Sequence, residues 1–181
     1  TIWGGSVQFL LRGSFYAVCT IWGGSDFKMK KIASFCVNHD KLLPGIYLSR
    51  VDGDVVTYDI RLVRPNCPPY LPNPVLHTIE HLFATFARNS AFSDHVIYFG
   101  PMGCRTGFYF LVSGMEHQDV IALIQDIFRR ISVFSEPVPG AACSAECGNY
   151  LEHDLPGARE WAAAFVPVIA AWTPEKLRYE E

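Results

Sequence analysis

The sequence Val-Val-Thr-Tyr-Asp-Ile-Arg-Leu-Val, residues 55–63, carries the clearest secondary-structure pattern in this chain. Apolar side chains occupy every second position, and polar side chains such as Asp59 and Arg61 stand between them. A period of two with one apolar face is typical of a β-strand that is buried on one side. The preceding dipeptide Asp52-Gly53 is a turn signal, which predicts a hairpin with a strand over residues 45–50.

The sequence after this strand predicts further regular elements. Asn73 is expected as the N-cap of a helix, with Pro74 in the first helical position, where a missing N–H costs nothing. The last of the three expected helices should start after Pro156, and Pro167 should kink or end it. The other expected elements are a helix to about residue 89, strands at 96–99 and 107–113, and a helix at about 118–134. This pattern predicts an α+β fold, with a mostly antiparallel sheet and helices packed on one face.

The amino-acid composition argues against several classes of protein. The chain has 181 residues, of which 50% are hydrophobic and 18% charged, enough for a sizeable core and too apolar for a disordered chain. A net charge of −3 without a basic stripe predicts no nucleic-acid partner. Because no run of about 18 uncharged apolar residues occurs, we also expect no membrane partner.

The first residues differ from the rest. The hexapeptide Thr-Ile-Trp-Gly-Gly-Ser occurs at residues 1–6 and again at 20–25, and two copies are too few for a solenoid. Regular patterning begins after Met29. We therefore expect residues 1–28 to be an appended leader outside the fold and residues 29–181 to form a single domain.

The six cysteines are spread along the chain, and only Cys143 and Cys147 are near one another. A chain of this size can fold without disulfide bonds, so this spacing does not predict a disulfide framework. We interpret the cysteines as reduced thiols of a cytoplasmic protein.

The segment His77-Thr78-Ile79-Glu80-His81 lies in the predicted helix that begins near Pro74. Residues four apart share one face of a helix, about 6 Å apart along its axis. His77 and His81 can therefore share one metal ion, and Glu80 can reach the space beside it without being a ligand.

Two kinds of third ligand are available. The inverted zinc-peptidase motif would use a downstream glutamate, here Glu146 or Glu152, which predicts a metallopeptidase. Cys147 would instead supply a thiolate, which with two neutral histidines holds a divalent transition metal and leaves a fourth position open. A site closed by four protein ligands would indicate a structural metal site in an interaction protein. The segment from His77 to His81 alone does not determine which of these activities the protein has.

A second chemically suggestive segment is Gly100-Pro101-Met102-Gly103-Cys104-Arg105-Thr106-Gly107. A cysteine in a glycine-flanked turn beside a cation has the exposure and charge that lower a thiol pKa. Cys104 is thus a candidate base or nucleophile, and the alternative is a packed cysteine in an ordinary turn.

These segments occur together in the order and spacing of one known family. The motifs are Lys30 to Phe35, His39, Tyr58 to Arg61, His77 to His81, Gly100 to Gly107, and Glu146 to Tyr150. From about Met29 to Ala163 the sequence resembles S-ribosylhomocysteine lyase, the LuxS family of autoinducer-2 synthases. The residues before Met29 match nothing in it, and those after Phe165 resemble it poorly.

The resemblance implies a role for each matching residue. His77, His81 and Cys147 look like the metal ligands, with Fe²⁺ the usual ion and Zn²⁺ or Co²⁺ as substitutes. Glu80 and Cys104 look like the acid–base pair of a carbon–sulfur lyase.

Further implications concern the substrate and the assembly. Ser34, His39 and Arg61 resemble the residues that surround the ribose of S-ribosylhomocysteine. The family enzyme is a homodimer with both sites at the interface, which suggests that the segment holding Ser34 and His39 crosses to the partner subunit. The expected products are L-homocysteine and 4,5-dihydroxy-2,3-pentanedione, the precursor of the quorum-sensing signal autoinducer-2. Homocysteine would return to methionine metabolism. Outside these motifs, His95, His117 and His153 are expected at the surface or as local caps.

Overall fold

The hairpin predicted from the alternating stretch is the first regular pair of the fold. In the computed structural model, which describes residues 30, 32 and 35–179, strand β1 spans Gly45–Asp52 and strand β2 spans Val55–Arg61. The strands pair antiparallel, and Gly53 in the turn has a φ of +67°. Glycine takes this left-handed conformation without the steric cost of a Cβ. The hairpin prediction is confirmed.

Two further strands complete the sheet. Strand β3 spans Val96–Pro101 after the short 3₁₀ helix η2 (Ser93–His95), and strand β4 spans Gly107–Ser113. The strand order is β1-β2-β4-β3, and every neighbouring pair is antiparallel. The turn between β3 and β4 contains Cys104.

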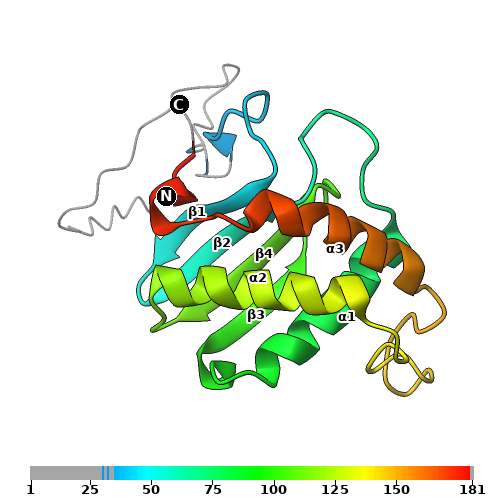
Figure 1. Cartoon of the computed structure of the whole chain (residues 1–181). Helices are drawn as coiled ribbons and strands as arrows, with labels where there is room; N and C mark the ends of the chain where they lie inside the picture. The colour runs from blue at the N-terminus through cyan, green and yellow to red at the C-terminus, as the bar shows by residue number, and fades with distance from the viewer. Residues whose placement is uncertain (1–29, 31, 33–34, 180–181) are drawn as a thin grey trace, which may run out of the picture. The chain divides into compact units, whose positions relative to one another are not determined.

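Three α-helices pack with this sheet around one core. They are α1 (Asn73–Arg88), α2 (His117–Val133) and α3 (Leu155–Ile169), and the 3₁₀ helix η3 (Pro174–Leu177) follows. Figure 1 shows α2 and α3 side by side across one face of the sheet, while α1 packs against β3. Large apolar side chains from the helices and the sheet form the core, among them Tyr58, Phe83, Phe108, Phe110 and Phe128. The predicted α+β fold is confirmed.

The start of α1 differs from the prediction. Pro72, rather than Asn73, occupies the N-cap of α1, and Asn73 is the first helical residue, so that expectation was wrong by one position. The carbonyl of Pro72 accepts the backbone N–H of Leu76 at 3.0 Å, which starts the helical ladder without a side-chain cap. Helix α3 continues to Ile169, two residues beyond Pro167.

Strand β2 is buried on both faces, although its alternation predicted one exposed face. Asp59 and Arg61, on the polar face, are each only 2% exposed. Arg61 Nη2 donates to Asp59 Oδ2 at 2.5 Å, and the hydroxyl of Tyr179 donates to the same oxygen at 3.1 Å. Buried charges are tolerated when they are paired and hydrogen-bonded, and this pairing lets the polar face be covered.

The elements above belong to one compact unit that begins at Val37. The predicted boundary after residue 28 lies outside the described residues and stays a prediction. The five described cysteines, at positions 36, 67, 104, 143 and 147, are free thiols. In the described part of the chain, no helix combines the length and the apolar character that crossing a membrane requires.

Candidate active site

Helix α1 presents two histidines whose ring orientation is fixed by backbone carbonyls. His77 Nδ1 donates to the carbonyl of Glu152 at 2.9 Å, and His81 Nδ1 donates to the carbonyl of Pro139 at 2.8 Å. A carbonyl oxygen can only accept, so both Nδ1 atoms carry the hydrogen and both Nε2 atoms keep a lone pair. Hydrogen bonds of this kind, from Nδ1 to a fixed carbonyl, orient histidine ligands toward a metal.

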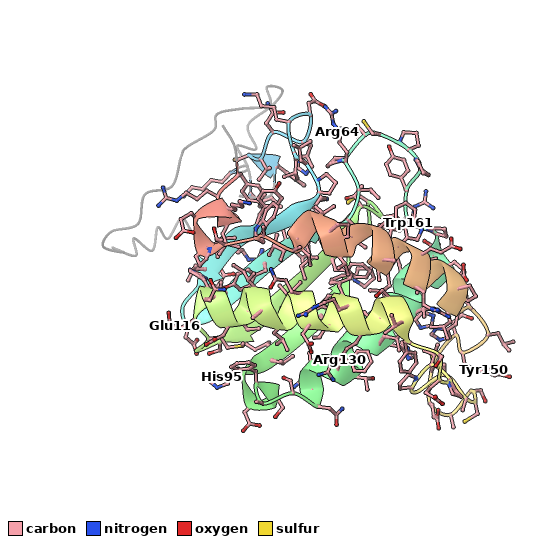
Figure 2. The ribbon with its side chains drawn as sticks, in the orientation of Figure 1. Arg64, His95, Glu116, Arg130, Tyr150 and Trp161 are labelled. Atoms are coloured by element: carbon pink, nitrogen blue, oxygen red, sulfur yellow. The ribbon has the colours of Figure 1, made fainter. Side chains whose placement is uncertain are left out.

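The loop between α2 and α3 supplies the carbonyl acceptors and a thiol. Tyr150, labelled in Figure 2, marks this loop beyond the ends of the helices. Cys147 from the loop places its Sγ 3.3 Å from His77 Nε2. Gly140, with a φ of +69°, follows Pro139 and allows the chain to turn where that carbonyl meets His81.

A third histidine joins this group. Ligand atoms of His77, His81, Cys147 and His153, called the metal cluster below, all lie within 4.8 Å of one another. Three imidazole nitrogens and one thiolate sulfur are a donor set suited to a divalent transition metal, so these residues fit the metal that the sequence predicted. Burial, together with the neighbouring His77 and His81, lowers the pKa of His153 to about 4, so this ring is neutral and can donate a lone pair.

The expectation that His153 lies at the surface or caps a helix was wrong. His153 directly precedes Asp154, whose carboxylate accepts the N–H of Gly157 at 2.9 Å and caps α3. Its place in the same loop as Cys147, immediately before a helix start, was the signal available in the sequence.

Glu80 lies beside the metal cluster without belonging to it. Together with His77 and His81 it lines an open cavity of about 610 Å³. Burial raises the pKa of Glu80, and the nearby His77 and His81 oppose that rise only in part. A carboxyl group with this environment can exchange a proton with a molecule in the cavity.

The two glutamates that a metallopeptidase could use as the third ligand form hydrogen bonds with other groups of the chain. Glu146 Oε2 accepts the backbone N–H of Ala142 at 3.2 Å, and the carboxylate of Glu152 accepts from the side chain of Asn149. Neither carboxylate is part of the metal cluster within the described ranges. Of the predicted third ligands, Cys147 is the one whose side chain lies with His77 and His81.

Cys104 forms a second group of residues at the β3–β4 turn. Its exposed thiol lies 3.0 Å from Thr106 Oγ1 and 3.7 Å from Arg61 Nη1, and Arg61 is paired with Asp59. We call Asp59, Arg61, Cys104 and Thr106 the thiol cluster. The turn is held close to β2 because Gly107 has no side chain: a Cβ there would lie 2.1 Å from the carbonyl oxygen of Ile60.

The cation beside the thiol is Arg61 rather than its sequence neighbour Arg105. Arg105 has a φ of +59°, and its guanidinium lies 6.0 Å from the ring centroid of Tyr70. Burial alone would lower the pKa of Arg61, but Asp59 and Cys104 raise it, so this residue remains a cation.

The predicted substrate-binding residues are only partly described. Arg61 belongs to the thiol cluster, and His39 lies close enough to Asp59 to act on it electrostatically. His39 Nδ1 donates to the carbonyl of Val37 at 2.9 Å. Ser34 lies outside the described residues.

The two clusters are separate groups within the described residues. The contacts of Cys104 are with Arg61 and Thr106, whereas the charges that act on Glu80 are those of His77 and His81. The cavity beside Glu80 is not lined by Cys104. The fold therefore does not join the two predicted acid–base residues directly.

Comparison with known proteins identifies the family to which most of the chain is related. The sequence model of one family, S-Ribosylhomocysteinase (LuxS), matches residues 32–176. The chain belongs to the LuxS family. This match extends past α3 into η3, further than the motifs alone indicated.

Individual LuxS relatives agree with the family match. The chain is 46% identical over 159 residues to an S-ribosylhomocysteine lyase of Clostridium acetobutylicum, which covers 84% of this chain and 100% of the relative. It is 46% identical over 157 residues to the S-ribosylhomocysteine lyase of Borreliella afzelii, covering 83% and 99%. It is 47% identical over 158 residues to that of Phocaeicola vulgatus, covering 83% and 98%.

The family resemblance predicted from the motifs is thus confirmed, and the chain is an enzyme of the carbon–sulfur lyase class. The matches do not favour a metallopeptidase or a structural metal protein. A metal-binding role fits the metal cluster found in the structure.

Proposed function

We propose that this chain cleaves S-ribosylhomocysteine to L-homocysteine and 4,5-dihydroxy-2,3-pentanedione, the precursor of autoinducer-2. The observation that carries this proposal is the convergence of His77, His81 and Cys147 beside Glu80 in a member of the LuxS family. The homocysteine released would be available to methionine metabolism.

The metal cluster accounts for one part of the chemistry. His77, His81 and Cys147 would hold the ion, which we propose to be Fe²⁺, with Zn²⁺ or Co²⁺ as substitutes. When bound, a divalent ion acts as a Lewis acid that polarises the carbonyl of the open-chain sugar and makes the adjacent C–H acidic.

Glu80 and Cys104 account for the proton transfers. One of them removes a proton from the carbon next to the carbonyl, and a proton returns to the former carbonyl carbon, so the carbonyl moves from C1 to C2. A second such exchange moves it to C3. Removal of the C4 proton then breaks the C5–S bond, and the departing homocysteine sulfur takes up a proton. Two bases with different positions suit this repeated transfer.

Arg61 and His39 would serve the sugar. The paired and buried Arg61 is fixed beside the Cys104 thiol, so it can orient a hydroxyl group near that thiol. We propose that Ser34 and His39 complete the surroundings of the ribose.

The direct test is an assay with S-ribosylhomocysteine. Full-length protein is purified without oxygen, loaded with Fe²⁺ and incubated with the substrate, and released thiol is measured with a chromogenic disulfide. The protein is removed by filtration before this readout because its own free cysteines would react. Release of homocysteine and of the dione in equal amounts supports the function, and absence of both refutes it.

Glu80 should affect turnover and not metal content. The Glu80→Gln variant is expected to lose about 10²-fold or more in kcat, because it removes a positioned proton carrier but no metal-cluster donor. Metal analysis should find the ion at the wild-type ratio. The matched control is Glu160→Gln at an exposed position of α3, which should keep wild-type turnover. A Glu80→Gln enzyme with normal kcat would exclude this residue from proton transfer.

The separation of the two clusters supports a shared site. We propose that the enzyme is a homodimer in which the thiol cluster of one subunit meets the metal cluster of the other. This arrangement would bring Cys104 and Glu80 to one substrate, although each chain holds them apart.

Mixing two inactive variants tests this assembly. Cys104→Ala and Cys147→Ala proteins are unfolded and refolded together. In mixed dimers one of the two sites would be intact, so random pairing should restore about a quarter of wild-type activity. Each variant refolded alone is the control. If both clusters of a site came from one chain, the mixture would stay inactive.

The setting of the reaction follows from its chemistry. Free thiols and an oxidation-sensitive Fe²⁺ ion require a reducing compartment, so we propose a cytoplasmic enzyme acting on a small molecule. We propose neither a nucleic-acid nor a membrane partner.

A further inference from the structure

The segment that follows α3 packs against the edge strand β1. Trp172 Nε1 donates to the carbonyl of Ile46 at 2.7 Å, and Gly45 leaves room for the indole ring, since a Cβ there would lie 2.2 Å from it. Leu177 of η3 is only 2% exposed. Figure 1 shows this part of the chain, drawn in red, beside β1. Tyr179 therefore comes two residues after an anchored segment.

The side chain of Tyr179 contacts both strands of the β1–β2 hairpin. Its ring stacks on that of Tyr47 in β1, with centroids 5.1 Å apart and an angle of 13° between the planes. Tyr47 is paired directly with Asp59 across the two strands, so these side chains lie on the same face of the sheet. The Tyr179 hydroxyl donates to Asp59 Oδ2 at 3.1 Å. Stacking on β1 thus brings this hydroxyl to the carboxylate of the thiol cluster.

The Tyr179 hydroxyl keeps its hydrogen for this bond. Burial, together with the charge of Asp59, raises the pKa of Tyr179 well above its usual range, and a hydrogen bond with Ser49 opposes that rise only in part. Burial also raises the pKa of Asp59, whereas Arg61, Tyr179 and His39 oppose that rise. Tyr179 is thus one of the groups that favour the ionised carboxylate.

The buried pair of Asp59 and Arg61 depends strongly on the hydrogen bonds that it makes. Asp59 Oδ1 and Arg61 Nε are buried and lack hydrogen-bond partners within the described part of the chain. The bonds at Asp59 Oδ2 therefore determine how the carboxylate is oriented. Arg61 Nη2 donates to that oxygen, while Nη1 donates to Thr106 and lies 3.7 Å from the Cys104 sulfur. A shift of the carboxylate would move the guanidinium relative to the thiol.

We propose that Tyr179 is a positioning residue that acts through Asp59. Its hydroxyl fixes the carboxylate, and the carboxylate holds the Arg61 guanidinium beside the Cys104 thiol. This role rests on the proposed function, in which Arg61 and Cys104 act on the sugar. The family model matches residues up to 176, so Tyr179 lies beyond the matched region.

Alkylation of Cys104 tests this role without a substrate. The Tyr179→Phe variant keeps the stacked ring and removes the hydroxyl. Its Cys104 is alkylated with anionic iodoacetate and with neutral iodoacetamide, and mass spectrometry of the Cys104 peptide gives both rates. The ratio of the two rates reports the positive charge beside the sulfur, because both reagents react with the same thiolate.

A guanidinium that is no longer held should lower the iodoacetate-to-iodoacetamide ratio at Cys104 about threefold. The exposed Cys67 of the same protein is the internal control and should keep its wild-type ratio. An unchanged ratio at Cys104 would overturn the proposal. A hydroxyl that only stabilised the fold would give that result together with a lower melting temperature.

Kinetics gives a second test of the same variant. Tyr179→Phe should lower kcat for S-ribosylhomocysteine about tenfold, as expected for loss of a hydrogen bond to a charged group, with KM within about twofold and the wild-type metal content. The control is Tyr70→Phe, which keeps the ring near the Arg105 guanidinium and should keep wild-type kcat. Unchanged kcat in Tyr179→Phe would overturn the proposal. If wild-type protein released no homocysteine, the proposed function would fail, and the alkylation ratio alone would decide the role of Tyr179.

Discussion

Replacement of Cys104 by alanine is expected to reduce turnover of S-ribosylhomocysteine by about 10²–10⁴-fold while leaving the bound metal in place. The thiol lies beside Arg61 and is exposed, so it can meet a substrate. Its sulfur does not belong to the metal cluster. The measurement is kcat by filtered thiol release, together with metal analysis of the same sample.

A matched variant separates this effect from general loss of a thiol. Cys67 is also a free, exposed cysteine, and it lies in the proline-rich loop before α1. Cys67→Ala should keep both turnover and metal. If Cys104→Ala retained wild-type kcat, Cys104 would have no part in proton transfer and the turn would serve packing only.

Replacement of Cys147 by alanine should remove the metal itself and abolish turnover. Cys147 is the sulfur donor of the cluster, and its Sγ lies 3.3 Å from His77 Nε2. Loss of a direct ligand should cost more metal affinity than the roughly 10–100-fold typical of residues that only hydrogen-bond to a ligand. Chelator competition and metal analysis after dialysis measure the change.

The neighbouring Cys143 provides the control for this variant. It is a free, exposed cysteine of the same loop, and Cys143→Ala should bind metal at the wild-type ratio. Full metal occupancy in Cys147→Ala would contradict the cluster as described. In that case the third metal ligand would be a carboxylate such as that of Glu146, as a metallopeptidase requires.

The strand pattern and the helix spacing were enough to predict the α+β fold and the pairing of His77 with His81. Both depend on local periodicity, which sequence displays directly. The burial of the polar face of β2 depends on Tyr179, which is 120 positions from Asp59. A contact of this kind has no periodic signal, so the second buried face was not predicted.

The surroundings of Cys104 and of the metal cluster show the same limit of prediction from sequence. Adjacency in sequence suggested Arg105 as the cation beside Cys104, but a left-handed backbone places the Arg105 guanidinium over Tyr70, and Arg61 arrives from another strand. His153 reaches the metal cluster because Thr78 of α1 anchors it from outside its own loop. The sequence predicted which types of residue form the site. Hydrogen bonds between segments that are distant in sequence determine which of the candidate residues take these places.

The anchored imidazoles have a consequence for which ion the enzyme carries. His77 and His81 are aligned by carbonyls of the folded chain, so the site of nitrogen and sulfur donors is held in place by the fold. A prepared site of nitrogen and sulfur donors binds zinc more tightly than ferrous iron. Protein isolated from zinc-rich medium should therefore carry zinc, and its metal content after purification would record supply and not catalytic preference.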